Sequence, residues 1–214
     1  HTAYRRQRQM CIRDSFLLDA SSSMNGIVRG DHQQVLRQEY SDGINWNIVT
    51  GDNIVTRMDE LNVGLQRFVR DILADPLAKL AADVAVMTFA RTVATVKEFG
   101  PIRESDSGLK ISTSQENETL LGEAVELALD ELDRRKRTYR AHGVEFYQPW
   151  LVVMTDGVPT SARHRELEGR LKELTAARKL SVFVFGIGRA DLSELCSISP
   201  GRPPMQVNDQ KFPE

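Results

Sequence analysis

Short apolar runs alternate along the chain with longer segments in which apolar residues recur every three or four positions. The short runs predict buried strands, and the longer segments predict amphipathic helices. Because strands that alternate with helices form parallel sheets covered on both faces, we expect an α/β fold with a doubly wound, mostly parallel sheet. The runs that predict strands are Phe16–Leu18, Asp83–Phe89, Trp150–Met154 and Ser181–Ile187.

The helical pattern occurs in four segments. The first should end before Asp75-Pro76, because proline cannot continue a helix. Residues 92–99 instead predict one antiparallel edge strand beside residues 83–89. The segments that we expect to be helical are 58–73, 121–132, 167–174 and 191–197.

The two ends of the chain do not follow this pattern. Arg13-Asp14-Ser15 interrupt the first strand, which should be almost wholly apolar at the centre of such a sheet. We therefore expect residues 1–14 to be a non-native or disordered extension, with 1–13 irregular and loosely packed; a genuine basic arm is the alternative. We expect one domain over 15–207 and a truncated tail over 208–214.

A long segment, 25–57, separates the first predicted strand from the first long helix. It contains four glycines and no helical period, although Trp46–Thr50 has the character of a short strand. A connection of this length is usually functional or disordered. Two roles for this insertion stay open at this point, a passive lid and a surface that selects a partner.

Oxygen-bearing side chains follow the first strand at alternate positions. Asp19, Ser21 and Ser23 come directly after its apolar residues, so their side chains can converge on one side. Ligands bind at the carboxyl ends of strands in open α/β sheets, and such oxygens suit a hard divalent cation. The pattern alone is weak evidence, because serine-rich turns are common.

Two later positions extend this set. Thr119 precedes an amphipathic segment, and Asp156 lies within Thr155-Asp156-Gly157 after another apolar run. Three loops thus offer Asp-x-Ser-x-Ser, Thr and Asp in that order. Over about residues 15–200 the chain resembles a von Willebrand factor A (VWA) domain with a metal-ion-dependent adhesion site (MIDAS). Ser22 departs from the glycine usual in the family, at a position that is not a ligand.

Within that family the chain resembles bacterial TerY-type proteins of the tellurium-resistance group. The resemblance implies a cytoplasmic bacterial scaffold in a stress-response or tellurite-resistance system, in which such domains accompany a kinase and a PP2C-type phosphatase. A metal-dependent adaptor in an unrelated operon is the alternative. The segments that carry this resemblance are 17–24, 62–66, 118–124, 147–150 and 155–160.

The resemblance also implies a Mg²⁺ site, in which Asp156 acts largely through water. Such a site leaves one coordination position open, which Mg²⁺ normally fills with water. An Asp or Glu carboxylate of a partner protein can replace that water, so we expect metal-bridged protein binding. The segments that we expect to line the rim of the site, because they leave directly from the ligand loops, are Met24, the 25–57 insertion and Val158-Pro159-Thr160. Mn²⁺ can substitute, and Ca²⁺ suits so compact a site less well. The metal ligands implied are Asp19, Ser21, Ser23, Thr119 and Asp156.

The rival class is an enzyme, a phosphotransferase or hydrolase that uses Asp19 and the metal. Position 21 is serine rather than a second carboxylate, and Ser21 lacks the Gly-x-Ser-x-Gly elbow of a hydrolase nucleophile. Cys196 has no motif and is interpreted as a small buried residue. We therefore expect no catalysis. The histidines that we interpret as surface or packing residues are His32, His142 and His164.

Composition narrows the class of partner and the compartment. A net charge of -2 over 214 residues argues against nucleic acid and against an anionic membrane surface. The two cysteines, Cys11 and Cys196, are too few for a disulfide scaffold and favour a reduced cytosolic state. No apolar run approaches the ~20 residues that span a bilayer.

Overall fold

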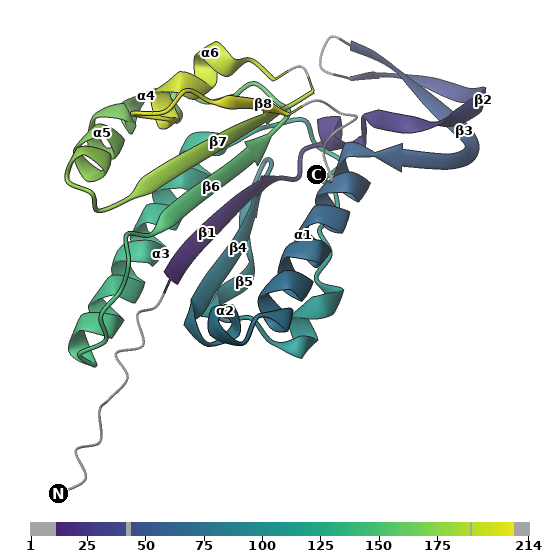
Figure 1. Cartoon of the computed structure of the whole chain (residues 1–214). Helices are drawn as coiled ribbons and strands as arrows, with labels where there is room; N and C mark the ends of the chain where they lie inside the picture. The colour runs from purple at the N-terminus through teal and green to yellow at the C-terminus, as the bar shows by residue number, and fades with distance from the viewer. Residues whose placement is uncertain (1–11, 42–43, 189, 208–214) are drawn as a thin grey trace, which may run out of the picture.

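A six-stranded sheet in the order β5-β4-β1-β6-β7-β8 forms the centre of the molecule (Figure 1). The computed structural model describes residues 12–41, 44–188 and 190–207. Five strands run parallel, and β5 pairs antiparallel with β4, which confirms the predicted sheet and its edge strand. The strands are β1 (Ile12–Asp19), β4 (Ala82–Phe89), β5 (Val93–Pro101), β6 (Trp150–Thr155), β7 (Ser181–Ile187) and β8 (Met205–Val207).

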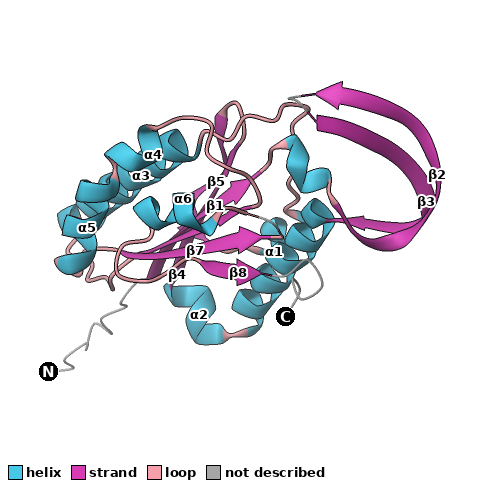
Figure 2. Ribbon diagram, turned by 90° about the horizontal axis from the view of Figure 1, so that it is seen from above, coloured by secondary structure: helices cyan, strands magenta, loops and turns pink. Residues whose placement is uncertain are grey.

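Helices cover both faces of this sheet (Figure 2). The two long helices lie on opposite faces, α1 on one and α3 on the other. The helix predicted over 167–174 is α5, and a short helix that the sequence pattern did not predict, α4, ends just before it at Glu166. The helices are α1 (Arg57–Ala74), α2 (Pro76–Ala81), α3 (Leu121–Ala141), α4 (Arg163–Glu166), α5 (Glu168–Ala176) and α6 (Leu192–Leu195).

Neighbouring residues of β1 enter two separate hydrophobic cores. Leu17 is fully buried in the core beneath α3 and α5, and Leu18 is buried in the core beneath α1. The reason is the alternation of side chains along a strand, which sends successive residues to opposite faces. Burial of each leucine contributes about 1.5–3 kcal/mol, so both faces of β1 hold the sheet to its helices.

The first strand starts earlier than the sequence predicts. Arg13-Asp14-Ser15 do not interrupt β1, which begins at Ile12, and the expectation of irregular structure is wrong for residues 12 and 13. Both neighbouring strands supply backbone partners here: Ser15 is in register with Ala85 and Leu151. Residues 1–11 lie outside the described part of the chain, and the predicted boundary at 14 falls inside β1.

The insertion over 25–57 forms a long two-stranded antiparallel ribbon, β2 (Ile27–Ser41) with β3 (Ile44–Thr56). The ribbon projects from the body beyond the start of α1 (Figures 1 and 2). The short strand expected at 46–50 is thus only the middle of a 13-residue strand. Four register shifts break the alternation of polar and apolar residues, which is why the sequence pattern underestimates both strands.

The loop between β5 and α3 is fixed to the body by the side chain of Asn62, which makes two hydrogen bonds to the backbone of one loop residue. Asn62 on α1 donates from Nδ2 to the carbonyl of Ile111 at 2.8 Å and accepts from the Ile111 amide at 2.7 Å. Both residues are buried. This polar loop, which contains one short 3₁₀ turn at Glu104–Gly108, therefore leads to Thr119 in a defined position.

Candidate metal centre

Three loops converge at the carboxyl edge of the sheet. Parallel strands β1 and β6 are in register from Asp14 and Trp150 to Leu18 and Met154, so Asp19 and Thr155 emerge side by side. The Thr155 hydroxyl donates to Asp19 Oδ2. This edge is where the crevice of an open α/β sheet lies.

The loop after β1 turns tightly and gathers its oxygen atoms. Asp19 Oδ1 accepts the amide hydrogen of Ser21 at 2.8 Å, and the Ser21 and Ser23 hydroxyls are 2.9 Å apart. A 3₁₀ turn over Ser22–Asn25 follows, so the convergence of these side chains comes from a turn rather than from extended backbone. Ser23 Oγ then donates to Asp156 Oδ1 at 2.6 Å, which joins the first loop to the third.

Thr119 is held beside these two loops by two hydrogen bonds to Thr160, in the third loop. Its amide donates to Thr160 Oγ1 and its carbonyl accepts from the Thr160 amide, both at 3.1 Å. A Cβ on Gly157 would lie 2.9 Å from Thr119 Oγ1 and 3.6 Å from Asp19 Oδ2. The Thr119 and Asp19 oxygens are therefore separated by at most the sum of these distances, 6.5 Å. Glycine is required at 157 because a side chain would displace Thr119.

The structure brings all five of the expected metal ligands together. Asp19, Ser21, Thr119 and Asp156 are buried, and Ser23 is half-buried. Among the described residues, no group of three His, Cys, Asp or Glu side chains has a geometry that could hold a metal. The five expected ligands are two carboxylates and three hydroxyls. Such oxygen donors fit a small hard cation such as Mg²⁺ rather than a soft one.

The electrostatics of the site favour an added positive charge. Burial, and then the charge of Asp156, raise the pKa of Asp19 from 3.8 to about 6, although hydrogen bonds from Thr155 and Ser21 act in the opposite direction. A bound cation would stabilise the ionised form of both carboxylates, because an opposite charge nearby favours the charged state. The raised pKa shows that the protein alone does not fully stabilise the negative charge of Asp19.

Sequence reasoning missed one charged residue at this site, Arg57. Its Nη1 atom lies 2.9 Å from Asp156 Oδ2, and the Asp156 side chain has no exposed area. Arg57 is the first residue of α1, directly after the ribbon. A single arginine at the end of a long insertion carries no motif, so the sequence offers no signal that would place it here.

A family model for the von Willebrand factor type A domain matches residues 15–212 of the chain. The chain belongs to the von Willebrand factor type A family. Domains of this family typically act in adhesion and protein binding. No curated protein matches the chain.

Several solved structures share the fold of this VWA domain. The SpRpn10 VWA domain is 13% identical, with a TM-score of 0.56, over 95% of this chain and 93% of that one. BatB from Bacteroides thetaiotaomicron is 18% identical, with a TM-score of 0.58, over 92% and 89%. Proximal thread matrix protein 1 from the mussel byssus, with a zinc-occupied MIDAS motif, is 19% identical, with a TM-score of 0.60, over 95% and 42%. The chain thus spans less than half of the mussel protein.

Two residues, Met24 and Cys196, have the opposite burial from the one that the sequence predicts. Met24 is completely buried in the core beneath α1, so the expectation that it lines the rim of the metal site is wrong. The 3₁₀ turn directs its side chain inward. Cys196 is exposed rather than buried, with its Sγ atom 3.3 Å from the Leu192 carbonyl, because it lies on the outer side of the turn that follows α6.

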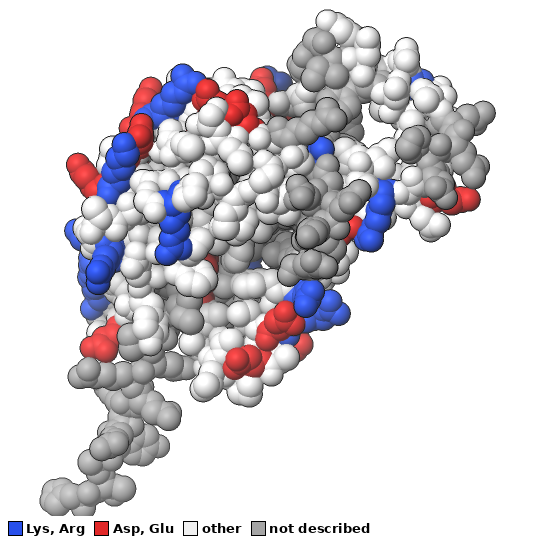
Figure 3. Space-filling view, turned by 45° about the horizontal axis from the view of Figure 1, so that its top comes forward, with Lys and Arg blue, Asp and Glu red and all other residues white. Residues whose placement is uncertain are grey.

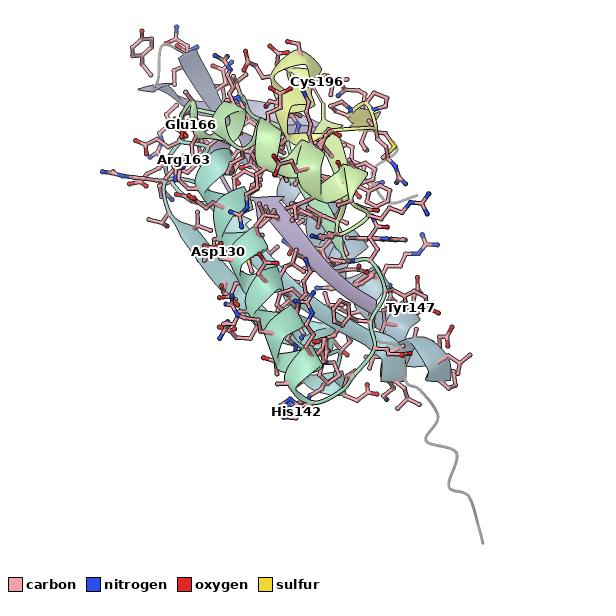
Figure 4. The ribbon with its side chains drawn as sticks, turned by 90° about the vertical axis from the view of Figure 1, so that its left-hand side faces the viewer. Asp130, His142, Tyr147, Arg163, Glu166 and Cys196 are labelled. Carbon is pink, nitrogen blue, oxygen red and sulfur yellow. The ribbon has the colours of Figure 1, made fainter. Side chains whose placement is uncertain are left out.

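The histidines do not form a second reactive site in the described structure. His164, a residue of α4, is buried, and its ring nitrogens contact the Ser161 carbonyl and Glu194 of α6. His142 lies at the C-terminal end of α3, and Cys196 lies at the opposite end of the molecule (Figure 4). The side chain of His32 lies outside the described part of the structure. Among the described residues, no helix is long and apolar enough to cross a membrane.

Proposed function

We propose that this VWA domain binds one Mg²⁺ ion, or Mn²⁺, and uses it to recognise an acidic residue of a partner protein. The observation that carries the proposal is the convergence of five oxygen-bearing residues from three loops at one edge of the sheet. The proposed metal ligands, directly or through water, are Asp19, Ser21, Ser23, Thr119 and Asp156.

The hydrogen bonds around the site suit hydroxyl ligation. A serine hydroxyl can offer a lone pair to a cation while it donates its hydrogen to a carboxylate. Ser23 already donates to Asp156 Oδ1, and Thr155 holds Asp19 Oδ2 without belonging to the ligand set. When bound, the cation supplies an open coordination position at which an Asp or Glu carboxylate of a partner can replace water.

The selectivity of such a site has to come from its surroundings, because a metal–carboxylate bond is common to all acidic partners. On the face shown in Figure 3, basic and acidic side chains are interspersed, so a broad charged field does not supply it. The ribbon and the turn after β6 supply exposed apolar side chains, Tyr40 at 74% and Val158 at 55% exposure. We propose that these two elements read the partner around its carboxylate.

The cellular setting is proposed from the resemblance alone. A TerY-type role places the domain in the cytoplasm of a bacterium, in a stress-response or tellurite-resistance system with a kinase or a PP2C-type phosphatase as partner. A metal-dependent adaptor of another system is the alternative. The gene neighbours of this chain separate these two settings.

The rival proposal is a phosphotransferase or hydrolase that uses Asp19 and the metal. Asp19 is fully buried, its Oδ1 accepts from the Ser21 amide, and its Oδ2 accepts from the Thr155 hydroxyl. Each oxygen has a second lone pair that a small cation can use, but the burial of the carboxylate leaves no room for an attacked phosphate, which favours a structural and metal-binding role. Turnover of a generic phosphate ester that is lost in Asp19→Ala would favour the enzyme instead.

Affinity capture tests the proposed function. The protein is immobilised and exposed to a bacterial lysate in Mg²⁺, and retained proteins are then released with EDTA. We expect the wild type to retain partners that EDTA releases and that Asp19→Ala does not retain, although its circular dichroism spectrum is unchanged. Partners that remain bound in chelator would show that the metal does not mediate the contact.

A further inference from the structure

A cavity of about 480 Å³ lies at the opposite edge of the sheet from the candidate metal centre. It is bordered by the C-terminal end of α3, by the segment 146–149 that leads into β6, and by the end of α5. That segment returns from the end of α3, near His142, past Tyr147 (Figure 4). The volume is in the range of sites that hold small molecules, about 300–1,000 Å³.

Cationic side chains dominate the lining of this cavity. Asp133 is the one acidic residue in the lining that the structure describes, and its Oδ1 atom lies 3.3 Å from Lys136 Nζ. Asp133 Oδ2 also lies 3.8 Å from Arg170, so two cations already share this carboxylate. The other cationic residues of the lining are Arg137, Arg140, Arg178 and Lys179.

These four cations are not offset by carboxylates. Within the described ranges none of them forms an ion pair, whereas Arg134 of the same helix pairs with Glu131. If Glu145 and Glu173, which adjoin the lining in the sequence, are both counted, two positive charges are still in excess. Like charges gathered around one cavity repel, and a bound anion would remove that repulsion.

Arg178 has a backbone conformation that glycine adopts more easily. Its φ is 52° in the turn that ends α5, where its amide donates to the Thr175 carbonyl and the Lys179 amide donates to the Leu174 carbonyl. Glycine is the usual residue at such a position after a helix. Among the described non-glycine residues, only Asn53 shares a positive φ. Strained residues of this kind cluster at ligand sites, and this one contributes a cation to the lining.

The remaining wall of the cavity is aromatic. Phe146 is half-buried, and Tyr147 is 50% exposed. The guanidinium carbon of Arg140 lies 5.8 Å from the centroid of the Phe146 ring, so a cation and an aromatic face meet in the lining. Guanidinium groups bind phosphate through paired hydrogen bonds, and an exposed aromatic ring offers a surface on which a planar group can stack.

We propose that this cavity binds a small phosphate ester that carries a planar group, of the class of a nucleoside diphosphate. The phosphates contact Arg140 and Arg178, and the planar group packs on Tyr147. This site goes beyond the proposed function and shares no residue with the candidate metal centre. The alternative is that the cations only stabilise the carbonyl ends of α3 and α5, a role that requires no ligand.

Isothermal titration calorimetry in EDTA at low ionic strength tests this site, with ADP, pyrophosphate and adenosine as probes. For the wild type we expect ADP to bind more tightly than pyrophosphate, and adenosine to bind too weakly to measure. Arg140→Gln and Arg178→Gly should each lower ADP affinity about tenfold, as loss of a hydrogen bond to a charged group does. Thermal unfolding should show Arg178→Gly to be at least as stable as the wild type, because glycine relieves the positive φ.

Two further variants separate the parts of the site. Tyr147→Ala should lower ADP affinity to that of pyrophosphate and leave pyrophosphate affinity unchanged. Arg134→Gln removes an exposed and paired cation from the same helix and should bind ADP as the wild type does. Weaker ADP binding in Arg178→Gly without loss of stability would favour a ligand site over stabilisation of the helix ends.

The contrary outcomes are equally specific. Wild-type protein that binds neither ADP nor pyrophosphate, or that binds them no better than Arg140→Gln and Arg178→Gly do, overturns the proposal. Equal affinity for ADP and pyrophosphate in the wild type overturns the assigned ligand class, because the aromatic wall would then contribute nothing. Since EDTA keeps metal ions from the protein, none of these outcomes bears on the proposed metal-dependent function.

Discussion

Ser23 donates its hydroxyl hydrogen to Asp156 Oδ1 at 2.6 Å, although 133 sequence positions separate the two residues. The bond joins the loop after β1 to the loop after β6. It also leaves the lone pairs of the Ser23 oxygen available to a cation.

Ser23→Ala should therefore weaken Mg²⁺ binding at least about tenfold, as loss of a group that holds a metal site typically does. The free energy of unfolding in chelator should fall by only about 1 kcal/mol, the usual value of one hydrogen bond. The matched control is Ser22→Ala, whose hydroxyl donates to Asn117 instead. Isothermal titration calorimetry checks both variants, and equal Mg²⁺ affinity in the two would contradict the assigned role of Ser23.

Gly157→Ala should disturb the metal site with little effect elsewhere. The added methyl group would lie 2.9 Å from Thr119 Oγ1, closer than a carbon atom and a hydroxyl oxygen normally approach. We expect Thr119 to be displaced and Mg²⁺ affinity to fall about tenfold or more. Gly169→Ala in α5 meets no atom within 4 Å and should leave Mg²⁺ affinity unchanged while it stabilises the fold by about 0.5–1 kcal/mol. Retained affinity in Gly157→Ala would remove Thr119 from the ligand set.

The ionisation of Asp19 should destabilise the metal-free protein at neutral pH. Its pKa is raised from 3.8 to about 6 in the fold, chiefly by burial and then by Asp156. A folded-state pKa above the unfolded value means that the folded protein binds the proton more tightly. Its contribution to stability is thus most favourable below about pH 4 and decreases as the pH rises to about 6.

Asp19→Asn should consequently be about 2–3 kcal/mol more stable than the wild type in EDTA at pH 7.5, and nearly equal to it below pH 4. Its Nδ2 group can donate to the Thr155 hydroxyl, which already faces that atom. Asp14→Asn is the matched control, because burial raises the pKa of Asp14 to about 6 at the other end of β1. Urea denaturation at both pH values measures the difference. Only Asp19→Asn should also lose Mg²⁺ binding.

Replacing residues 30–52 by a short turn should change the choice of partner without loss of Mg²⁺ affinity. The cut is suitable because Arg29 pairs with Val55 and Asp31 with Asp52, so the remaining ends lie close together. The deletion removes the exposed Tyr40 but keeps Arg57 and every proposed metal ligand. Calorimetry with Mg²⁺ and affinity capture from lysate check the two halves of the prediction. Capture of the same partners at the same affinity would reduce the ribbon to a passive lid.

The sequence was sufficient for the centre of the sheet because β4, β6, β7 and residues 16–18 of β1 are apolar on both faces, as their double burial demands. It did not predict β8, which has only three residues. The five proposed ligands could be found because each lies next to a strand end or a helix start, where local pattern predicts position. Arg57 could not be found in this way. Its role depends on the path of a ribbon whose pattern is broken by register shifts.

The errors at other residues have equally local causes. Met24 follows a proposed ligand directly, and only the 3₁₀ turn decides that its side chain enters the core. Arg13 and Asp14 are polar, yet they continue β1 because β4 offers backbone partners to both, and β6 offers one to Asp14 as well. Pairing between distant segments decided these cases, and a single sequence does not reveal such pairing.

Anomalous diffraction from crystals soaked in Mn²⁺ would locate the proposed metal site. We expect one strong manganese peak at the carboxyl edge of the sheet, at about 2.1 Å from hydroxyl oxygens of the loops after β1 and before α3. Ser21, Ser23 and Thr119 should provide those oxygens, and Asp19→Ala crystals should lack the peak. A wild-type crystal with no manganese at this edge, or with manganese bound only elsewhere, would show that these five residues do not form a metal site.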